Sequence, residues 1–152
     1  MTSAQKSVEV NCYVTTAYNQ WTQFEDFPKF MDGVEHVRQL DDRNLHWKVK
    51  INGVEREFDA EITEQLPDER IAWRSTGGPE QAGVVTFHKL DDSTTRVMLQ
   101  LDMEPEGLVE KAGDKLGFVE RQVTKDLENF KRLVEERGQP TGAWRGEVPR
   151  EG

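Results

Sequence analysis

The sequence of 152 residues contains a single cysteine, Cys12, and no long apolar run. One cysteine forms no disulfide within the chain and no cysteine-based metal site, a pattern typical of proteins in a reducing compartment. No stretch approaches the roughly 18 apolar residues of a transmembrane helix. The N-terminal segment MTSAQKSVEV lacks the apolar core of a secretion signal. We therefore expect a cytoplasmic protein without an integral membrane segment.

Basic residues are also scarce. The chain has 20 lysines and arginines against 29 aspartates and glutamates, which gives a formal net charge of −9. Nucleic acids and anionic lipid surfaces are bound by a local surplus of Lys and Arg, and no such cluster is present in the sequence. The histidines, His36, His46 and His88, match no metal-ligand spacing and have no nucleophile partner. We expect no nucleic-acid partner, no metal and no cofactor.

Alternation of apolar and polar residues predicts seven β-strands. They are expected at 7–14, 34–40, 45–51, 54–63 and 70–75, and in two runs built on Gly83, Val85 and Phe87 and on Val97, Leu99, Leu101 and Met103. Asn52-Gly53 is a strong two-residue hairpin signal. Such short connections predict antiparallel neighbours.

Helical spacing is present in two regions. Ala17, Trp21 and Phe24 predict a short helix capped by Thr15 or Thr16, and Pro28 ends or redirects it before a second short helix or turn. From about Glu106 the period is helical up to a stop at Gly138. This helix is expected to be about 45 Å long. Its apolar stripe is Val109, Ala112, Leu116, Val119, Val123, Leu127, Phe130 and Val134.

This order of elements predicts an α+β fold in which a seven-stranded curved antiparallel sheet grips the long C-terminal helix. The two short helices after the first strand are expected to plug one end of the grip. The segment FEDFPKFM (24–31) would then place aromatic side chains at the mouth of a cavity. We expect one domain over residues 1–137, followed by a Gly/Pro-rich tail at 138–152 that is flexible or loosely docked.

Several segments resemble the START/polyketide cyclase–dehydrase superfamily, whose architecture is the helix-grip fold. They are WTQFEDFPKFMDGVEHVRQL, RIAWRSTGG, GVVTFHKLDDSTTRVMLQLDMEPEG and the long final helix, which with the first strand span about residues 7–136. These motifs specify a fold and not a reaction. The resemblance implies binding of hydrophobic molecules such as lipids, sterols or polyketides. Some members of the superfamily cyclise or dehydrate polyketides.

Three polar residues are candidates for catalysis. Arg56 falls in the apolar phase of its strand, where it could hold a carboxylate or enolate oxygen, or could instead reach solvent or a structural acid. Glu120 and Thr124 lie one helical turn apart at the edge of the stripe and could supply an acid/base and a hydroxyl, or form a solvated flank. Gly113 and Gly117 either open room for a ligand or allow the helix to bend.

The predicted binding site consists of the residues that face inward in this phasing. Its members are Phe27, Phe30, Trp47, Arg56, Phe58, Trp73, Phe87, Leu116, Glu120 and Val123. Core packing is the alternative role for the aromatic ones. Phe118 points away from the stripe and is either an ordinary exposed aromatic or the mark of a dimer or partner contact. Trp144 in the polar tail poses the same question and could also dock back onto the domain or cover the pocket.

The function predicted from the sequence is binding of a lipid- or polyketide-like hydrophobic molecule between the sheet and the long helix. The first alternative is an enzyme of the polyketide cyclase/dehydratase type that uses Arg56, Glu120 and Thr124. The second alternative is a non-catalytic interaction protein, such as a homodimer with Phe118 and the tail at the contact.

Overall fold

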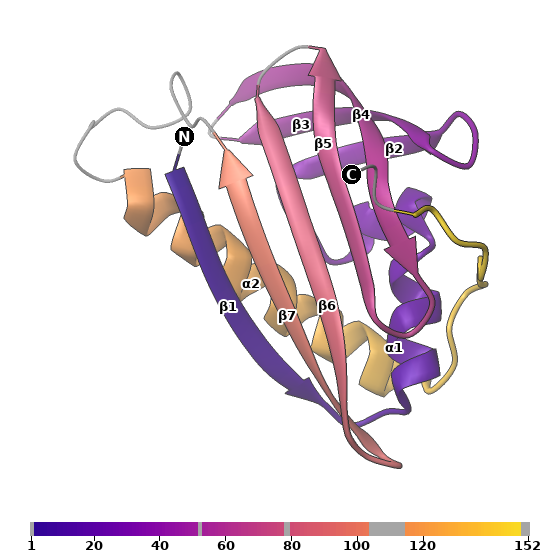
Figure 1. The fold of residues 1–152 in the computed structure, drawn as a ribbon. Helices are drawn as coiled ribbons and strands as arrows, with labels where there is room; N and C mark the ends of the chain where they lie inside the picture. The colour runs from indigo at the N-terminus through magenta and orange to yellow at the C-terminus, as the bar shows by residue number, and fades with distance from the viewer. Residues whose placement is uncertain (1, 52, 78–79, 104–114, 150–152) are drawn as a thin grey trace.

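A computed structural model describes residues 2–51, 53–77, 80–103 and 115–149. The described residues form a seven-stranded sheet that curls around a long helix, with two short helices at one end (Figure 1). The strands are β1 (Thr2–Val10), β2 (Val34–Gln39), β3 (Asn44–Ile51), β4 (Val54–Leu66), β5 (Arg70–Gly77), β6 (Gln81–Asp91) and β7 (Thr94–Met103). The helices are α1 (Val14–Trp21), the 3-10 helix η1 (Phe24–Lys29) and α2 (Lys115–Arg137). None of the helices in these ranges is long and apolar enough to cross a membrane.

The strand order in the sheet is β1-β7-β6-β5-β4-β3-β2, and every neighbouring pair is antiparallel. The predicted sheet and its helix-grip arrangement are therefore confirmed. The predicted position of the first strand is wrong, because β1 begins at Thr2 and ends at Val10. Its limits follow from pairing with β7, from Thr2 opposite Met103 to Val10 opposite Thr95. The chain then turns, and α1 starts at Val14 with Tyr13, not Thr15 or Thr16, at its N-cap.

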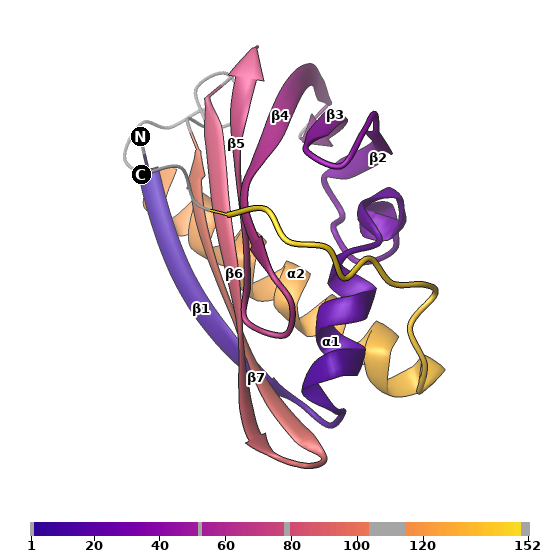
Figure 2. The same cartoon turned by 45° about the vertical axis from the view of Figure 1, so that its right-hand side comes forward.

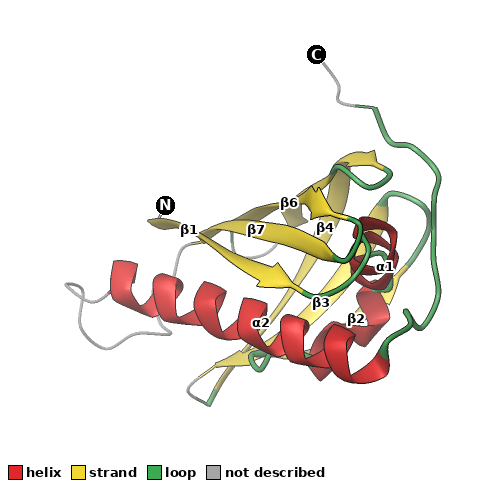
Figure 3. Cartoon of the chain, turned by 90° about the horizontal axis from the view of Figure 1, so that it is seen from below, coloured by secondary structure: helices red, strands yellow, loops and turns green. Residues whose placement is uncertain are grey.

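Helix α2 lies across the concave face of the sheet (Figure 3). The predicted stripe is confirmed for Val119, Val123, Leu127, Phe130 and Val134, all of which are buried. Leu116 is an exception with 52% exposure, since the first turn of α2 lies beyond the edge strand β1 (Figure 1). Phe118 is partly buried and packs against the core. Val109, Ala112 and Gly113 lie outside the described residues.

The segment FEDFPKFM closes the end of the core. Phe24, Phe27 and Phe30 are all buried, with exposures of 1% or less. The rings of Phe27 and Phe30 pack at 5.6 and 5.3 Å from the Trp21 ring, and Phe130 of α2 lies 4.9 Å from the same ring. Edge-on aromatic contacts of this kind add stabilisation to the burial of their area. The expectation of an aromatic cavity mouth at Phe27 and Phe30 is therefore corrected, because these rings are part of the core.

The tail was expected to be flexible or loosely docked, and residues 139–149 lie along α1 and the end of β4 in the structure (Figure 2). Thr141 is bonded to the buried Gln20 through its backbone N–H (3.0 Å) and its hydroxyl (3.2 Å). Val148 exchanges two backbone hydrogen bonds with Gln65 of β4, at 2.8 and 2.9 Å. Trp144 is partly buried against the core. These partners are far apart in the sequence, so composition gave no sign of the docking.

Arg145 connects the tail to two other elements. Its guanidinium donates to Asn19 of α1 (2.7 Å) and to Asp68 in the turn between β4 and β5 (2.8 Å). The same group lies 5.5 Å from the centre of the Tyr18 ring. Asp68 has a left-handed φ of 63°, a conformation that aspartate tolerates better than most residues. Arg145 therefore holds α1, the turn and the tail together.

We expect Arg145→Met to lower the free energy of unfolding by about 1 kcal/mol, because an ion pair, a hydrogen bond and a cation–π contact are lost at a partly exposed position. Urea unfolding followed by circular dichroism measures the change. Arg132→Met is the matched control, since Arg132 is exposed on α2. Equal effects of the two substitutions would contradict this role of Arg145.

Candidate functional site

A small cavity of about 40 Å³ lies between the sheet and α2. It is lined by Met31, Gly33, Val34, Trp47, Val49, Trp73, Gln81, Leu99, Leu101, Met103, Gln122 and Asp126. A water molecule needs about 10–15 Å³ on this scale, so the space holds on the order of three waters. The walls are mainly apolar, and the polar groups come from two strands, β3 and β5, from the start of β6 and from α2.

Two tryptophans, Trp47 on β3 and Trp73 on β5, shape the sheet side of the cavity. The rings of Trp47 and Trp73 are stacked with centres 6.3 Å apart and planes 21° apart. Trp73 lies flat over Gly83, its partner on β6, where a Cβ atom would come within 2.2 Å of the indole ring. A glycine inside a strand marks such a close approach. Gly83 therefore provides the space that the indole of Trp73 occupies.

The α2 side of the cavity carries a buried carboxyl group. Asp126 is 4% exposed, and its Oδ1 accepts a hydrogen bond of 3.0 Å from the Nε2 of Gln122. Burial raises the pKa of Asp126 to about 8, and the nearby Asp32 carboxylate acts in the same direction. The hydrogen bond from Gln122, the cation of Lys125 and the backbone N–H of Asp32 lower this pKa by smaller amounts than burial raises it. Asp126 is therefore protonated and uncharged at neutral pH.

Several buried polar atoms at the cavity have no hydrogen-bond partner among the described residues. They are the indole Nε1 atoms of Trp47 and Trp73 and the side-chain Oε1 of Gln81. Such atoms also occur on Tyr18, Trp21, Gln65 and Asp68, none of which lines this cavity. A buried donor or acceptor without a partner costs about 1–3 kcal/mol, so each of these atoms is a place where a bound molecule gains a hydrogen bond.

Of the residues predicted to line a binding site, Trp47 and Trp73 do line the cavity. The others do not, although Phe27, Phe30, Phe58, Phe87 and Val123 are buried in the adjoining core. Asp126 was missed by the sequence analysis. It lies seven positions after Val119 and four before Phe130, so the same helical spacing places it on the buried stripe.

The three predicted catalytic residues do not meet at the cavity. Arg56 is half-buried near the hairpin end of β4, and its guanidinium donates to the backbone oxygen of Glu55 at 2.9 Å. Glu120 is paired with Lys6 of β1 at 3.7 Å, with both side chains more than 40% exposed. Thr124 is exposed, and Gly117 is half-buried on the same helix. Glu120 and Thr124 therefore lie on a flank of α2 that is at least partly exposed, and neither they nor Arg56 line the cavity.

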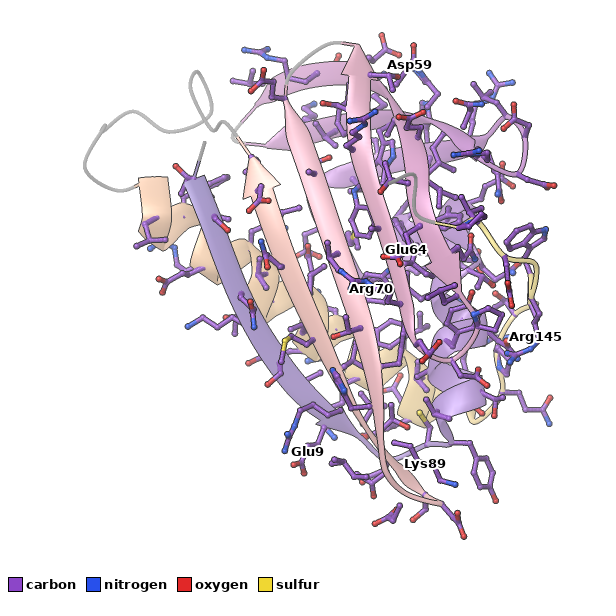
Figure 4. All side chains as sticks on the ribbon, in the orientation of Figure 1. Glu9, Asp59, Glu64, Arg70, Lys89 and Arg145 are labelled. Carbon is purple, nitrogen blue, oxygen red and sulfur yellow. The ribbon has the colours of Figure 1, made fainter. Side chains whose placement is uncertain are left out.

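The outer face of the sheet offers a larger groove of about 350 Å³. Its charged groups include Arg70 and Glu64, which lie side by side on the face opposite α2 (Figure 4) and form an ion pair of 3.0 Å. Arg74 and Glu61 form a second pair at 2.8 Å. The described residues include no group of three or more His, Cys, Asp or Glu side chains that could hold a metal ion.

Comparison with known proteins agrees with this fold. Residues 10–132 match the model of a family described as polyketide cyclase / dehydrase and lipid transport. The chain belongs to this family. It is 62% identical over 149 residues to an uncharacterised 17.2 kDa protein of Streptomyces lincolnensis, covering 97% of this chain and 99% of the relative. The resemblance to the START/polyketide cyclase–dehydrase superfamily is thereby confirmed.

Solved structures of the superfamily share the fold of this family member. The Zhui aromatase/cyclase of Streptomyces sp. R1128 is 19% identical, with a TM-score of 0.73 over 93% of this chain and 98% of the other. A START superfamily protein of Mycobacterium smegmatis is also 19% identical, with a TM-score of 0.70 over 90% of this chain and 97% of the other. At this identity the likeness concerns the fold.

The contact between Trp73 and Gly83 leads to a prediction. Gly83→Ala is expected to lower the free energy of unfolding by about 1–3 kcal/mol, because the new methyl group displaces the Trp73 ring into the cavity. The near-ultraviolet circular dichroism of the tryptophans should change as well. Gly77→Ala is the control. Gly77 is the last residue of β5, the strand that pairs with β6, and a Cβ atom added there has no other atom within 4 Å. A larger loss of unfolding free energy in Gly77→Ala than in Gly83→Ala would contradict this account.

The raised pKa of Asp126 leads to a second prediction. Between about pH 4 and pH 8 the folded protein keeps a proton that the unfolded chain has released, so the free energy of unfolding falls as the pH rises through this window, by up to about 1.4 kcal/mol per pH unit. Asp126→Asn should flatten this dependence in urea unfolding measured across the window. Asp92→Asn, at a side chain with 91% exposure, should leave it unchanged. Parallel curves for wild type and Asp126→Asn would refute the assignment.

Proposed function

We propose that this family member binds a hydrophobic molecule in the cavity between the sheet and α2. The observation that carries the proposal is the combination of apolar walls with buried polar atoms that lack partners. Leu99, Leu101 and Met103 supply apolar surface, while Trp47 and Trp73 supply unused N–H donors. Ligand sites in proteins have this composition, mostly apolar with a few placed polar groups.

The size of the cavity limits what binds without rearrangement. Sites for drug-sized ligands enclose roughly 300–1,000 Å³, whereas this cavity is about 40 Å³. Met31 and Met103 line it on different sides, and methionine is the apolar side chain that adapts most easily to a new shape. A compact ligand fits with small adjustments of these methionines. A ligand of lipid or polyketide size requires the sheet and α2 to separate further.

Binding is better supported than the two alternatives drawn from the sequence. Cyclase/dehydratase chemistry was expected to use Arg56, Glu120 and Thr124, but these residues lie apart and outside the cavity. A dimer contact was expected at Phe118 and the tail, but Phe118 and Trp144 both pack against their own core. Neither set of residues offers the concentrated, unsatisfied surface that the cavity does.

Native mass spectrometry of the protein purified from its natural host tests the proposal. We expect a bound small molecule that is released on denaturation, and Val34→Phe should reduce its occupancy at least about tenfold by filling the cavity. Val8→Phe is the matched control, because Val8 is also a half-buried strand valine but does not line the cavity. No bound mass, or equal loss in both variants, would show that the cavity is not a ligand site.

A further inference from the structure

We infer that the cavity selects an uncharged molecule that carries a hydrogen-bond-accepting oxygen, and that it rejects carboxylates of the same shape. This inference rests on the proposed function and names the class of ligand for that site. Three features carry it: the charge of the lining, the balance of unused donors and acceptors, and the surroundings of Asp126.

The lining provides no cation for an anionic ligand. Asp126 is the one ionisable side chain among the described residues that line the cavity. The nearest basic group on the same helix, Lys125, pairs with Asp32 at 2.6 Å, and both of these side chains are more than half exposed. A ligand carboxylate would therefore be buried beside an acidic group without a counter-ion. Burying an unpaired charge is much more costly than burying a neutral polar group.

Donors outnumber acceptors among the unused polar groups. The indole nitrogens of Trp47 and Trp73 only donate, and neither has a partner. The protonated carboxyl of Asp126 adds an O–H, while its Oδ1 is already occupied by Gln122. The unused acceptor is the Oε1 of Gln81. A ligand oxygen of the ketone, aldehyde or ester type satisfies a donor, whereas an ammonium group leaves both indole N–H groups unpaired.

The groups around Asp126 predict how binding depends on pH. Gln122 and Lys125 face it from α2, and the carboxylate and backbone N–H of Asp32 face it from the segment between η1 and β2. On the sheet side, the lining contributes Trp47, Trp73, Gln81 and apolar residues and no ionisable group. Ionisation of Asp126 removes its O–H donor. It also adds a negative charge, which attracts the nearby N–H donors. Binding of a neutral acceptor should therefore weaken as the pH rises.

Three probes of nearly equal shape test the inference: methyl isopropyl ketone, isobutyrate and isobutylamine. The full chain is labelled with ¹⁵N, and the indole N–H resonances of Trp47 and Trp73 are assigned with Trp47→Phe and Trp73→Phe. We expect the ketone to shift both resonances and to bind at least about tenfold more tightly than isobutyrate at about pH 6. The indole resonance of Trp144, which is not part of the cavity lining, is the internal control.

The pH dependence separates a role of Asp126 from simple hydrophobic binding. The affinity for the ketone should fall several-fold between about pH 6 and pH 9, through the range in which Asp126 titrates. In Asp126→Asn, whose amide keeps an N–H donor and does not ionise, the affinity should be the same at both pH values. A ketone affinity that falls equally in wild type and Asp126→Asn would overturn the role given to Asp126.

The outcomes distinguish this inference from the proposed function. If isobutyrate or isobutylamine binds as tightly as the ketone and shifts the same resonances, the cavity is a ligand site but the selection for a neutral acceptor is refuted. If the ketone alone binds, the inference is supported. If none of the probes moves the two indole resonances while the protein from its host carries a bound molecule lost in Val34→Phe, the inference fails and the proposed function stands.

Discussion

The structure depends on covering the concave apolar face of the curled sheet. A single helix meets this need because α2 presents a continuous apolar stripe, and the stripe ends in aromatic contacts with the short helices. Phe130 is the meeting point, since its ring lies 4.9 Å from that of Trp21 and 5.2 Å from that of Phe30. Burial of this much aromatic surface is the main stabilising term for such a core. The position of α2, and with it the cavity, follows from these contacts.

Asp126 is an exception on that stripe. An apolar residue at this position would fill space and remove the cost of burying a carboxyl group. The chain instead holds the group uncharged by desolvation, which outweighs the opposing effect of the hydrogen bond that Gln122 donates. Unpaired polar atoms on Trp47, Trp73 and Gln81 stand at the same cavity. Such departures from a consistent core concentrate where a protein has a function, and this is why the cavity is the best candidate for one.

Much of the fold was predictable from the sequence, and the candidate site was predictable only in part. Alternation along the strands and the stripe from Val119 to Val134 identify the sheet and α2, because both patterns express local geometry. Trp47 and Trp73 were expected to face inward, and they line the cavity. Asp126 was not expected, although its spacing from Val119 placed it on the same stripe. Phe27 and Phe30 were assigned to a cavity mouth because sequence pattern does not distinguish lining from packing.

The sequence by itself determined which side chains face the interior, since the periods of strand and helix depend on the backbone alone. Only the tertiary structure decided how much space remained between them. That space depends on whether the Trp73 ring lies over Gly83, on how closely α2 approaches the sheet, and on where the first turn of α2 leaves the sheet and exposes Leu116. The docking of residues 139–149 was likewise decided by partners such as Gln20 and Gln65. Contacts between residues distant in the chain follow from three-dimensional packing, which local pattern does not encode.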